Sequence, residues 1–509
     1  MTSRFIEKIH DNARKRPEHI AYFTSREGES ITFGELDSWS DSVAAFLSAN
    51  APTGKPVVVY GHKSPLMLVC FIAAVKAGLT YAPVDIAYPA DRVNDILSQI
   101  DHPLVISLAD DGFSGDPSLA ALLVDLSTIQ IACRSNATWD PAHWISGATP
   151  FYLLFTSGST GRPKGVQMPS QCVDAFMDYF ITLFPQRDDG VSFNRVPYTF
   201  DVSLFDIIAG LASGYTLFAL ETEDEQSMRA TFDALSKSGL TTWVSTPSFI
   251  EMCLADASFN ASLLPKLDNI ILCGEVLRNA TALKLLERFP DTRVLNTYGP
   301  TETQAVTDIV VDAQLATTVN PLPVGYPNGG VRAIVRDPES GNELPQGEIG
   351  EIYLAGNTVS AGYFGRPDLT QAVFSEVLDA EGRTERCYKT GDKGYIDEEG
   401  RLFCLGRLDF QVKLNGFRVE LADVEQALVR VAEVGEAVVL PAERDGKVTH
   451  LVAHVRLADP EAAGDFATSR QIKAALRDLV PDYMVPKKIV FHDEFALNVN
   501  GKIDRKALA

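Results

Sequence analysis

The sequence predicts an α/β protein with a large N-terminal domain of layered α/β sheets, a β subdomain at the end of that domain, and a small α+β C-terminal domain. Strand-like apolar runs alternate with helical patterns through the first three quarters of the chain, which is typical of mostly parallel sheets. Short strands with turn glycines follow after about residue 325. A third pattern, with two helices and a hairpin, begins near residue 409.

The individual elements follow from the spacing of apolar residues. The N-terminal helix is predicted to be amphipathic because Phe5, Ile6, Ile9 and Ala13 recur at helical spacing. A buried helix is expected over residues 66–77, ended by a glycine. The predicted strands are residues 56–61, 80–85, 104–108, 122–126, 151–155, 241–247, 268–274 and 293–299.

The last hundred residues differ from the rest. They contain a predicted helix over residues 421–431, a hairpin at Asp445 and Gly446, and a helix with Ile472, Leu476 and Leu479 on one face. We therefore place the large domain at residues 1–408, its β subdomain at about 325–408, and the small domain at 409–509.

Composition limits the classes of function. The net charge of −22 disfavours nonspecific binding to nucleic acid or to an anionic membrane, which both need a basic face. The longest apolar run, residues 66–75, is too short to cross a bilayer, and the N-terminus lacks the pattern of a signal peptide. Seven scattered cysteines favour a reducing compartment. We expect a cytoplasmic protein without membrane insertion.

A glycine- and hydroxyl-rich loop, TSGSTGRPKG at residues 156–165, follows the strand at 151–155. Glycines allow close approach to a polyphosphate, successive amides can form an anion nest, and Lys164 adds charge. The loop does not have the Walker spelling, and Pro163 argues against a helix directly after it. We predict phosphate binding; a solvated Gly/Ser loop is the alternative.

Two further stretches carry side chains suited to a nucleotide. In NTYGPTET, residues 296–303, Tyr298 could stack on a base and Glu302 could bind Mg²⁺; a simple Gly-Pro turn is the alternative. In YKTGDKG, Asp392 is expected in a turn between strands, where its carboxylate could accept hydrogen bonds from both ribose hydroxyls. An Asp turn that bonds its own backbone is the local alternative.

Two basic stretches complete the set. GRLDFQVKLNGFRVEL, residues 406–421, places Arg407, Asp409, Lys413 and Arg418 around a glycine hairpin. NVNGKIDRKAL near the C-terminus places Lys502 in a turn, where a basic side chain is ordinarily solvated.

In this order and spacing, these five motifs resemble the AMP-forming adenylating superfamily of acyl-CoA synthetases, luciferases and peptide-synthetase adenylation domains. The resemblance covers essentially the whole chain. Within the superfamily, the stretches STPSFIEMCLADASFN, LCGEVL, RFPDTRVLNTYGPTE and GRLDFQVKLNGFRVEL are most similar to stand-alone ligases that load D-alanine onto a carrier protein.

The resemblance implies a reaction in two steps. ATP and an amino-acid carboxylate give aminoacyl-AMP and pyrophosphate, and the acyl group then passes to the phosphopantetheine thiol of a carrier protein. The implied partners are D-alanine and a D-alanyl carrier protein serving lipoteichoic acid D-alanylation, with ATP and Mg²⁺ as cofactors and a monomeric enzyme. The alternative is a ligase that loads L-alanine, glycine or serine in natural-product biosynthesis.

The resemblance also implies roles for single residues. Lys502 bridges the carboxylate and phosphate oxygens, Glu302 binds Mg²⁺, and the small domain is mobile about a hinge at Asp409. The implied ATP contacts are Thr156, Ser157, Gly158, Thr160, Lys164, Asn296, Thr297, Tyr298, Gly299, Pro300, Thr301, Asp392, Cys404, Leu405, Gly406, Arg407 and Lys502.

Substrate choice is expected to rest on three further positions in addition to Lys502. By resemblance Asp201 holds the α-ammonium group, although it could also cap the helix pattern that follows. Cys273 is expected to form a wall of the pocket and not to act as a nucleophile. Ala305 stands where the resembling ligases have a bulkier valine, so the pocket is expected to be slightly larger.

Overall fold

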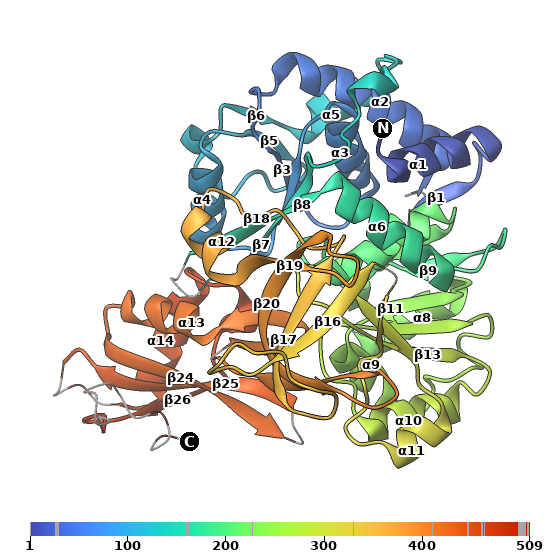
Figure 1. Cartoon of the computed structure of the whole chain (residues 1–509). Helices are drawn as coiled ribbons and strands as arrows, with labels where there is room; N and C mark the ends of the chain where they lie inside the picture. Colours follow the sequence, from blue (N-terminus) through green and yellow to red (C-terminus); the bar gives the residue numbers. More distant parts are fainter. Residues whose placement is uncertain are drawn as a thin grey trace.

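The computed structural model describes residues 2–25, 30–158, 162–225, 227–328, 330–409, 411–444, 447–459, 462, 464–496, 505 and 508. A large domain of two sheets carries a β subdomain at its centre, and the small C-terminal domain lies beside both (Figure 1). The predicted α/β class, with a large N-terminal and a small C-terminal domain, is confirmed.

The larger sheet has nine strands in the order β15-β14-β13-β12-β11-β9-β10-β1-β2. Its central pairs are parallel, and its edges are antiparallel. The strands are β1 (Ile20–Thr24), β2 (Ser30–Thr32), β9 (Val191–Phe193), β10 (Thr216–Ala219), β11 (Thr242–Ser245), β12 (Asn269–Leu272), β13 (Arg293–Tyr298), β14 (Thr307–Val310) and β15 (Tyr326–Pro327).

The second sheet has seven strands in the order β18-β8-β7-β4-β3-β5-β6, parallel except for β7-β8 and β8-β18. The strands are β3 (Val57–Gly61), β4 (Tyr81–Asp85), β5 (Leu104–Ser107), β6 (Leu122–Val124), β7 (Pro150–Thr156), β8 (Lys164–Pro169) and β18 (Gly362–Tyr363). The strands predicted from the sequence in both sheets are confirmed to within a few residues.

Helices pack between and outside these sheets. Strand β3 shows this directly, because Val57 and Val59 join the core between the sheets while Val58 and Tyr60 join a separate core on the outer face. The inner layer holds α1 (Arg4–Lys15), α2 (Phe33–Asn50), α3 (Pro65–Lys76), α5 (Leu126–Cys133), α6 (Ser170–Phe180) and a π-helix (Phe205–Gly210). The other helices are α4 (Ala90–Ile100), α7 (Thr222–Glu225), α8 (Met228–Lys237), α9 (Pro247–Leu254), α10 (Asn279–Arg288) and α11 (Ala313–Thr318).

The β subdomain is an antiparallel sheet in the order β16-β17-β20-β19, with β21 added to β20. Its elements are β16 (Val331–Arg336), β17 (Gly350–Gly356), α12 (Pro367–Val373), β19 (Phe374–Leu378), β20 (Thr384–Ile396) and β21 (Leu402–Arg407). The change to antiparallel strands predicted after residue 325 is confirmed.

The small domain has a separate apolar core. Its elements are β22 (Gln411–Leu414), β23 (Phe417–Glu420), α13 (Leu421–Val429), β24 (Val434–Arg444), β25 (Lys447–Leu457), α14 (Phe466–Arg477), a 3-10 turn (Asp482–Met484) and β26 (Lys488–Phe491). Strands β24 and β25 form the predicted hairpin, although its turn at Asp445 and Gly446 lies outside the described residues. Leu479 was placed wrongly on the last helix, because α14 ends two residues earlier.

A two-residue turn brings the small domain against the large one. Asn415 and Gly416 join β22 to β23, and both have positive φ angles, of 51° and 88°, as a type I′ turn requires. A Cβ on Gly416 would lie 2.4 Å from Cγ2 of Thr246 in the large domain. Glycine is therefore needed here both for the turn and for the close approach. The β22–β23 hairpin thus lies at the candidate site.

Among the described residues, no helix has the length and apolarity needed to cross a membrane. All seven cysteines are free thiols.

Candidate active site

The loop at residues 156–165 connects two antiparallel strands. Thr156 ends β7 and pairs in register with Lys164 at the start of β8. A Cβ on Gly158 would lie 2.1 Å from the carbonyl oxygen of Arg162, so the turn accepts only glycine at that position. The predicted strand before the loop is confirmed, as is the prediction that no helix follows directly. Thr160 lies outside the described residues.

Ser157 of this loop contacts the small domain instead of pointing into solvent. Its hydroxyl donates to the carbonyl oxygen of Arg418 at 2.8 Å and accepts from the amide of Glu420 at 3.2 Å. In this orientation of the small domain, the hydroxyl of Ser157, which is predicted to hold phosphate, is therefore engaged in hydrogen bonds with strand β23.

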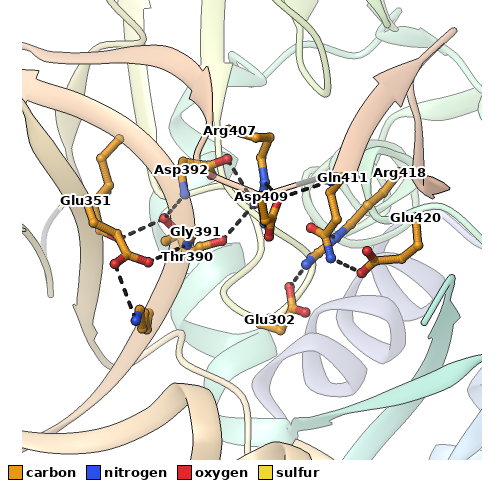
Figure 2. Close-up of polar contacts among 12 residues, drawn as sticks. Glu302, Glu351, Thr390, Gly391, Asp392, Arg407, Asp409, Gln411, Arg418 and Glu420 are labelled. Carbon is orange, nitrogen blue, oxygen red and sulfur yellow. Dashed lines mark hydrogen bonds and ion pairs between the residues drawn. The ribbon is translucent and has the colours of Figure 1, made fainter. Parts of the chain in front are cut away.

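Glu302 lies at the centre of a buried cluster of charges. Its Oε2 accepts from Nη1 of Arg418 at 2.7 Å, and its Oε1 accepts from the hydroxyl of Tyr363 at 2.7 Å. Nζ of Lys164 lies 3.9 Å from Oε1 of Glu302 and 3.8 Å from Oε1 of Glu420. Figure 2 shows Arg418 reaching Glu302 from the small domain.

The pKa values in this cluster follow from burial and charge. Burial raises the pKa of Glu302, but the charges of Arg418 and Lys164 outweigh it and lower the pKa to about 2. Burial and the neighbouring Arg418 lower the pKa of Lys164 to about 8. The carboxylate of Glu302 is thus held ionised at neutral pH.

This shift predicts a pH-dependent contribution to stability. Glu302 ordinarily titrates near 4.5 and in the folded protein near 2, so its stabilisation is present above pH 4.5 and is lost as the pH falls toward 2. We expect the destabilisation caused by Glu302→Gln to shrink by about 3 kcal/mol between pH 6 and pH 2. Urea unfolding of the native protein and the variant at both pH values measures this change in the free energy of unfolding. Glu339→Gln, at an exposed position, is the control. An equal effect of Glu302→Gln at both pH values would contradict the shift.

Tyr298 and Asp392 form the core of the predicted nucleoside site. The hydroxyl of Tyr298 donates to Oδ2 of Asp392 at 2.6 Å, and Nη1 of Arg407 lies 3.0 Å from Oδ1. Nζ of Lys413 lies 5.6 Å from the centre of the Tyr298 ring. Each carboxylate oxygen of Asp392 keeps further acceptor capacity for a ribose hydroxyl.

The turn expected at Asp392 is wrong. Asp392 lies inside the long strand β20, where Gly391 has a positive φ of 74° and the pairing with β21 shifts register. A bulge in a strand and a tight turn both use glycine at positive φ, which explains the error. The carboxylate also does not bond its own backbone in the manner of an Asp turn; its partners are Tyr298 and Arg407.

A cleft of about 400 Å³ lies beside these residues, between the large and the small domain. Leu405 does not line this cleft, and the residue is 36% exposed. The predicted ATP contacts that line the cleft are Asn296, Thr297, Tyr298, Asp392, Cys404, Gly406 and Arg407.

A smaller cavity of about 30 Å³, lined by Asp201, shares Asp392, Arg407 and Lys413 with this cleft. Gly299, Pro300 and Thr301 line it, so this part of the predicted ATP stretch faces the Asp201 side. Gly416 and the β22–β23 hairpin form the opposite wall in this orientation.

Asp201 does not cap a helix. It is the first residue of a 3-10 turn (Asp201–Ser203) whose capping position is Phe200, with no side-chain cap. Burial raises the pKa of Asp201, and a hydrogen bond with Thr301 and the charge of Lys413 offset this only in part. The carboxylic group lines the small cavity, where a bound ammonium group would favour its ionised form.

Cys273 and Ala305 lie in the same apolar core. Cys273 directly follows β12, and burial raises the pKa of its thiol to about 11. A thiol with such a pKa is a poor nucleophile at neutral pH, which agrees with the prediction that Cys273 is not a nucleophile. Neither Cys273 nor Ala305 lines the cleft or the small cavity, so a pocket wall at these positions stays a prediction.

Asp409 connects the two domains through an ion pair with Arg407. Its Oδ2 lies 2.5 Å from Nη2 of Arg407, and its Oδ1 accepts from the amide of Gln411 at 3.1 Å. A hinge at Asp409 stays a prediction. The predicted catalytic Lys502 lies outside the described residues.

Several polar residues of the site carried no role in the sequence prediction. Glu275 accepts from the amide of Gly416 at 2.6 Å, and Nζ of Lys447 lies 3.6 Å from its Oε2. Glu275 and Arg418 both lie in motifs already noted in the sequence. Each is a charged residue close to a glycine of its motif, and this could have marked it as a candidate site residue. Tyr363 lies outside those motifs, and only the fold brings it to Glu302.

The chain matches two family models. The model described as AMP-binding enzyme covers residues 9–364, and the model described as AMP-binding enzyme C-terminal domain covers residues 423–502. The chain therefore belongs to the AMP-binding enzyme family, and the resemblance inferred from its motifs is confirmed.

Within this family, the chain is similar along its whole length to proteins named D-alanine--D-alanyl carrier protein ligase. It is 40% identical over 507 residues to the one from Bacillus mycoides (strain KBAB4), covering 99% of each chain. It is 38% identical over 508 residues to the one from Bacillus velezensis (strain DSM 23117 / BGSC 10A6 / LMG 26770 / FZB42), again covering 99% of each.

Solved structures show the same fold at lower identity. The adenylation domain AlmE of Vibrio cholerae in complex with glycyl-adenosine-5'-phosphate matches with a TM-score of 0.80 and 22% identity, covering 100% of this chain and 97% of that chain. The holo-PA1221 protein, which contains adenylation and PCP domains, matches with a TM-score of 0.82 and 23% identity, covering 99% and 83%.

Proposed function

We propose that this enzyme joins D-alanine to AMP with release of pyrophosphate and then transfers the D-alanyl group to the phosphopantetheine thiol of a D-alanyl carrier protein. The choice of D-alanine rests on the full-length similarity to ligases of that name. The observation that carries the chemistry is that two neighbouring cavities share walls: Asp392, Arg407 and Lys413 line both the cleft and the cavity of Asp201.

In the first step, a carboxylate oxygen of D-alanine attacks the α-phosphorus of ATP, and the bond to the β-phosphate oxygen breaks. Asp201 holds the ammonium group, and Tyr298 and Asp392 hold the nucleoside. Two anions approach each other in this step, so a cation at the developing charge lowers the barrier. We assign that role to Lys502.

Glu302 fits the metal that this chemistry implies. Mg²⁺ is typically bound by one or two carboxylates together with substrate phosphates, and Glu302 provides one carboxylate, 3.9 Å from Lys164 of the predicted phosphate loop. The ion would neutralise phosphate oxygens when bound. Both oxygens of Glu302 are engaged by Tyr363 and Arg418, so the metal fits after Arg418 has moved.

In the second step, the carrier thiolate attacks the carbonyl carbon of D-alanyl-AMP, and AMP leaves. Between the two steps, a rotation of the small domain about Asp409 changes which of its residues face the substrate. The product serves D-alanylation of lipoteichoic acid. We place this reaction in the cytoplasm, in keeping with seven free cysteines, and assign it to a monomer.

The alternative is a stand-alone enzyme that loads another small amino acid, L-alanine, glycine or serine, in natural-product biosynthesis. Ala305 favours it, because alanine at this buried position, in the same apolar core as Cys273, would leave more room there than the valine of the resembling ligases.

Amino-acid-dependent exchange between ATP and pyrophosphate separates the two proposals. We expect kcat/KM for D-alanine to exceed that for L-alanine, glycine and serine by about 10–200-fold, the range that one methyl group provides in an apolar pocket. D-alanine performing no better than L-alanine or glycine would support the alternative and contradict the proposal.

A further inference from the structure

The ion pair between Arg418 and Glu302 is a contact between the two domains. Arg418 lies on β23 of the small domain, and Glu302 lies after β13 of the large domain. Nη1 and Oε2 are 2.7 Å apart, and the side chain of Glu302 is fully buried. A buried charge pair of this kind is costly to break by removing one partner, because it leaves an uncompensated charge.

The small domain holds the guanidinium group of Arg418 in place. Nε of Arg418 donates to Oε1 of Gln411 at 3.0 Å, and the side chain of Gln411 also donates to Glu420. The carbonyl oxygen of Arg418 accepts from Ser157. Figure 2 shows this chain of contacts running from Glu420 through Gln411 and Arg418 to Glu302.

Glu302 needs a cation whichever way the small domain lies. Without Arg418, the described neighbours of its carboxylate are the neutral hydroxyl of Tyr363 and Lys164, whose Nζ is 3.9 Å from Oε1. Oε2 would then have no described donor. An ion ligated by Oε2 and a guanidinium nitrogen 2.7 Å from Oε2 compete for the same position.

We propose that Arg418 is a positioning residue that takes the cation position at Glu302 when the β22–β23 hairpin is docked, so that Arg418 and Mg²⁺ exclude each other at this carboxylate. Binding of Mg²⁺ with ATP then requires the hairpin to leave. Release of the metal with pyrophosphate lets the hairpin return for thiol transfer. This inference rests on the proposed function for the order of the two steps.

Calorimetric titration of the full chain with Mg²⁺ and ATP, without amino acid, tests the exclusion. We expect Arg418→Met to bind Mg²⁺-ATP more tightly than the native enzyme, by roughly tenfold if the docked orientation makes up about nine-tenths of the free enzyme. Arg418→Lys keeps a positive charge on a shorter side chain and should give a smaller gain in affinity for Mg²⁺-ATP. Thermal unfolding checks that both variants are folded.

The matched control is Arg430→Met. Arg430 also joins the domains, with Nη2 2.6 Å from Oδ2 of Asp91, but it contacts neither Glu302 nor the cleft. We expect it to leave the affinity for Mg²⁺-ATP unchanged. An equal gain in Arg430→Met would mean general loosening of the small domain and would overturn the proposal, as would an unchanged or weaker affinity in Arg418→Met.

Hydrogen exchange gives a second readout without turnover. The amide of Glu420 is protected by Ser157 while the hairpin is docked, so Mg²⁺-ATP should speed its exchange in the native enzyme. In Arg418→Met this exchange should already be fast. A hydrogen-exchange rate of the Glu420 amide that does not change on addition of Mg²⁺-ATP to the native enzyme would overturn the inference. Neither measurement uses an amino acid. Their outcome therefore does not depend on whether D-alanine supports exchange between ATP and pyrophosphate.

Discussion

Lys502→Ala is expected to abolish exchange between ATP and pyrophosphate while the protein remains folded. The loss of one donor at the developing charge typically costs about 2.7–4 kcal/mol, which corresponds to a rate decrease of roughly 10²–10³-fold. The KM for ATP and for the amino acid should change far less, because the lysine acts on the charge that develops in the transition state.

Lys488→Ala is the control for this prediction. Lys488 begins β26 in the same domain and is exposed, so its loss removes a positive charge without touching the site. Full exchange activity in Lys502→Ala would overturn the role assigned to Lys502. A drop of similar size in Lys488→Ala would show that the effect is one of net charge.

Asp201→Asn should raise the KM for the amino acid by roughly 10²-fold, because removal of one partner of a buried, hydrogen-bonded charge pair costs about 2–5 kcal/mol. The substrate ammonium group would keep a neutral acceptor of the same shape but lose its counter-charge. The KM for ATP should remain within a few-fold, since Tyr298 and Asp392 hold the nucleoside independently.

Initial rates of exchange at varied amino acid and at varied ATP separate these two effects. Asp174→Asn provides a buried control outside both cavities: its carboxylate accepts from the amide of Phe5 at 3.2 Å and lines neither of them. An Asp201→Asn enzyme with an unchanged KM for the amino acid would contradict ammonium binding at this position.

The layered architecture could be predicted because local patterns agree with it. Apolar runs such as residues 56–61 become fully buried strands, and the amphipathic spacing of Phe5, Ile6 and Ile9 becomes the buried face of α1. Glycine-rich stretches are less informative, because positive φ serves turns and bulges alike. This is why Asp392 was expected in a turn and lies in β20.

The charge network at the site could not be predicted in the same way. Glu302 and Arg418 are 116 residues apart in sequence, and they meet because the small domain is docked. Tyr363 reaches the same carboxylate from β18, a two-residue strand. Contacts of this kind depend on domain orientation, about which neither periodicity nor local motif spelling carries information.

The central claim is that one enzyme makes D-alanyl-AMP and passes the acyl group to a carrier thiol. Incubation of the enzyme with ATP, Mg²⁺, D- or L-alanine and a phosphopantetheinylated D-alanyl carrier protein tests it directly, with the carrier analysed by intact mass spectrometry. We predict a D-alanyl thioester on the carrier, with one AMP and one pyrophosphate released for each acyl group transferred. Absence of the thioester with D-alanine, or faster loading with L-alanine, would contradict this account.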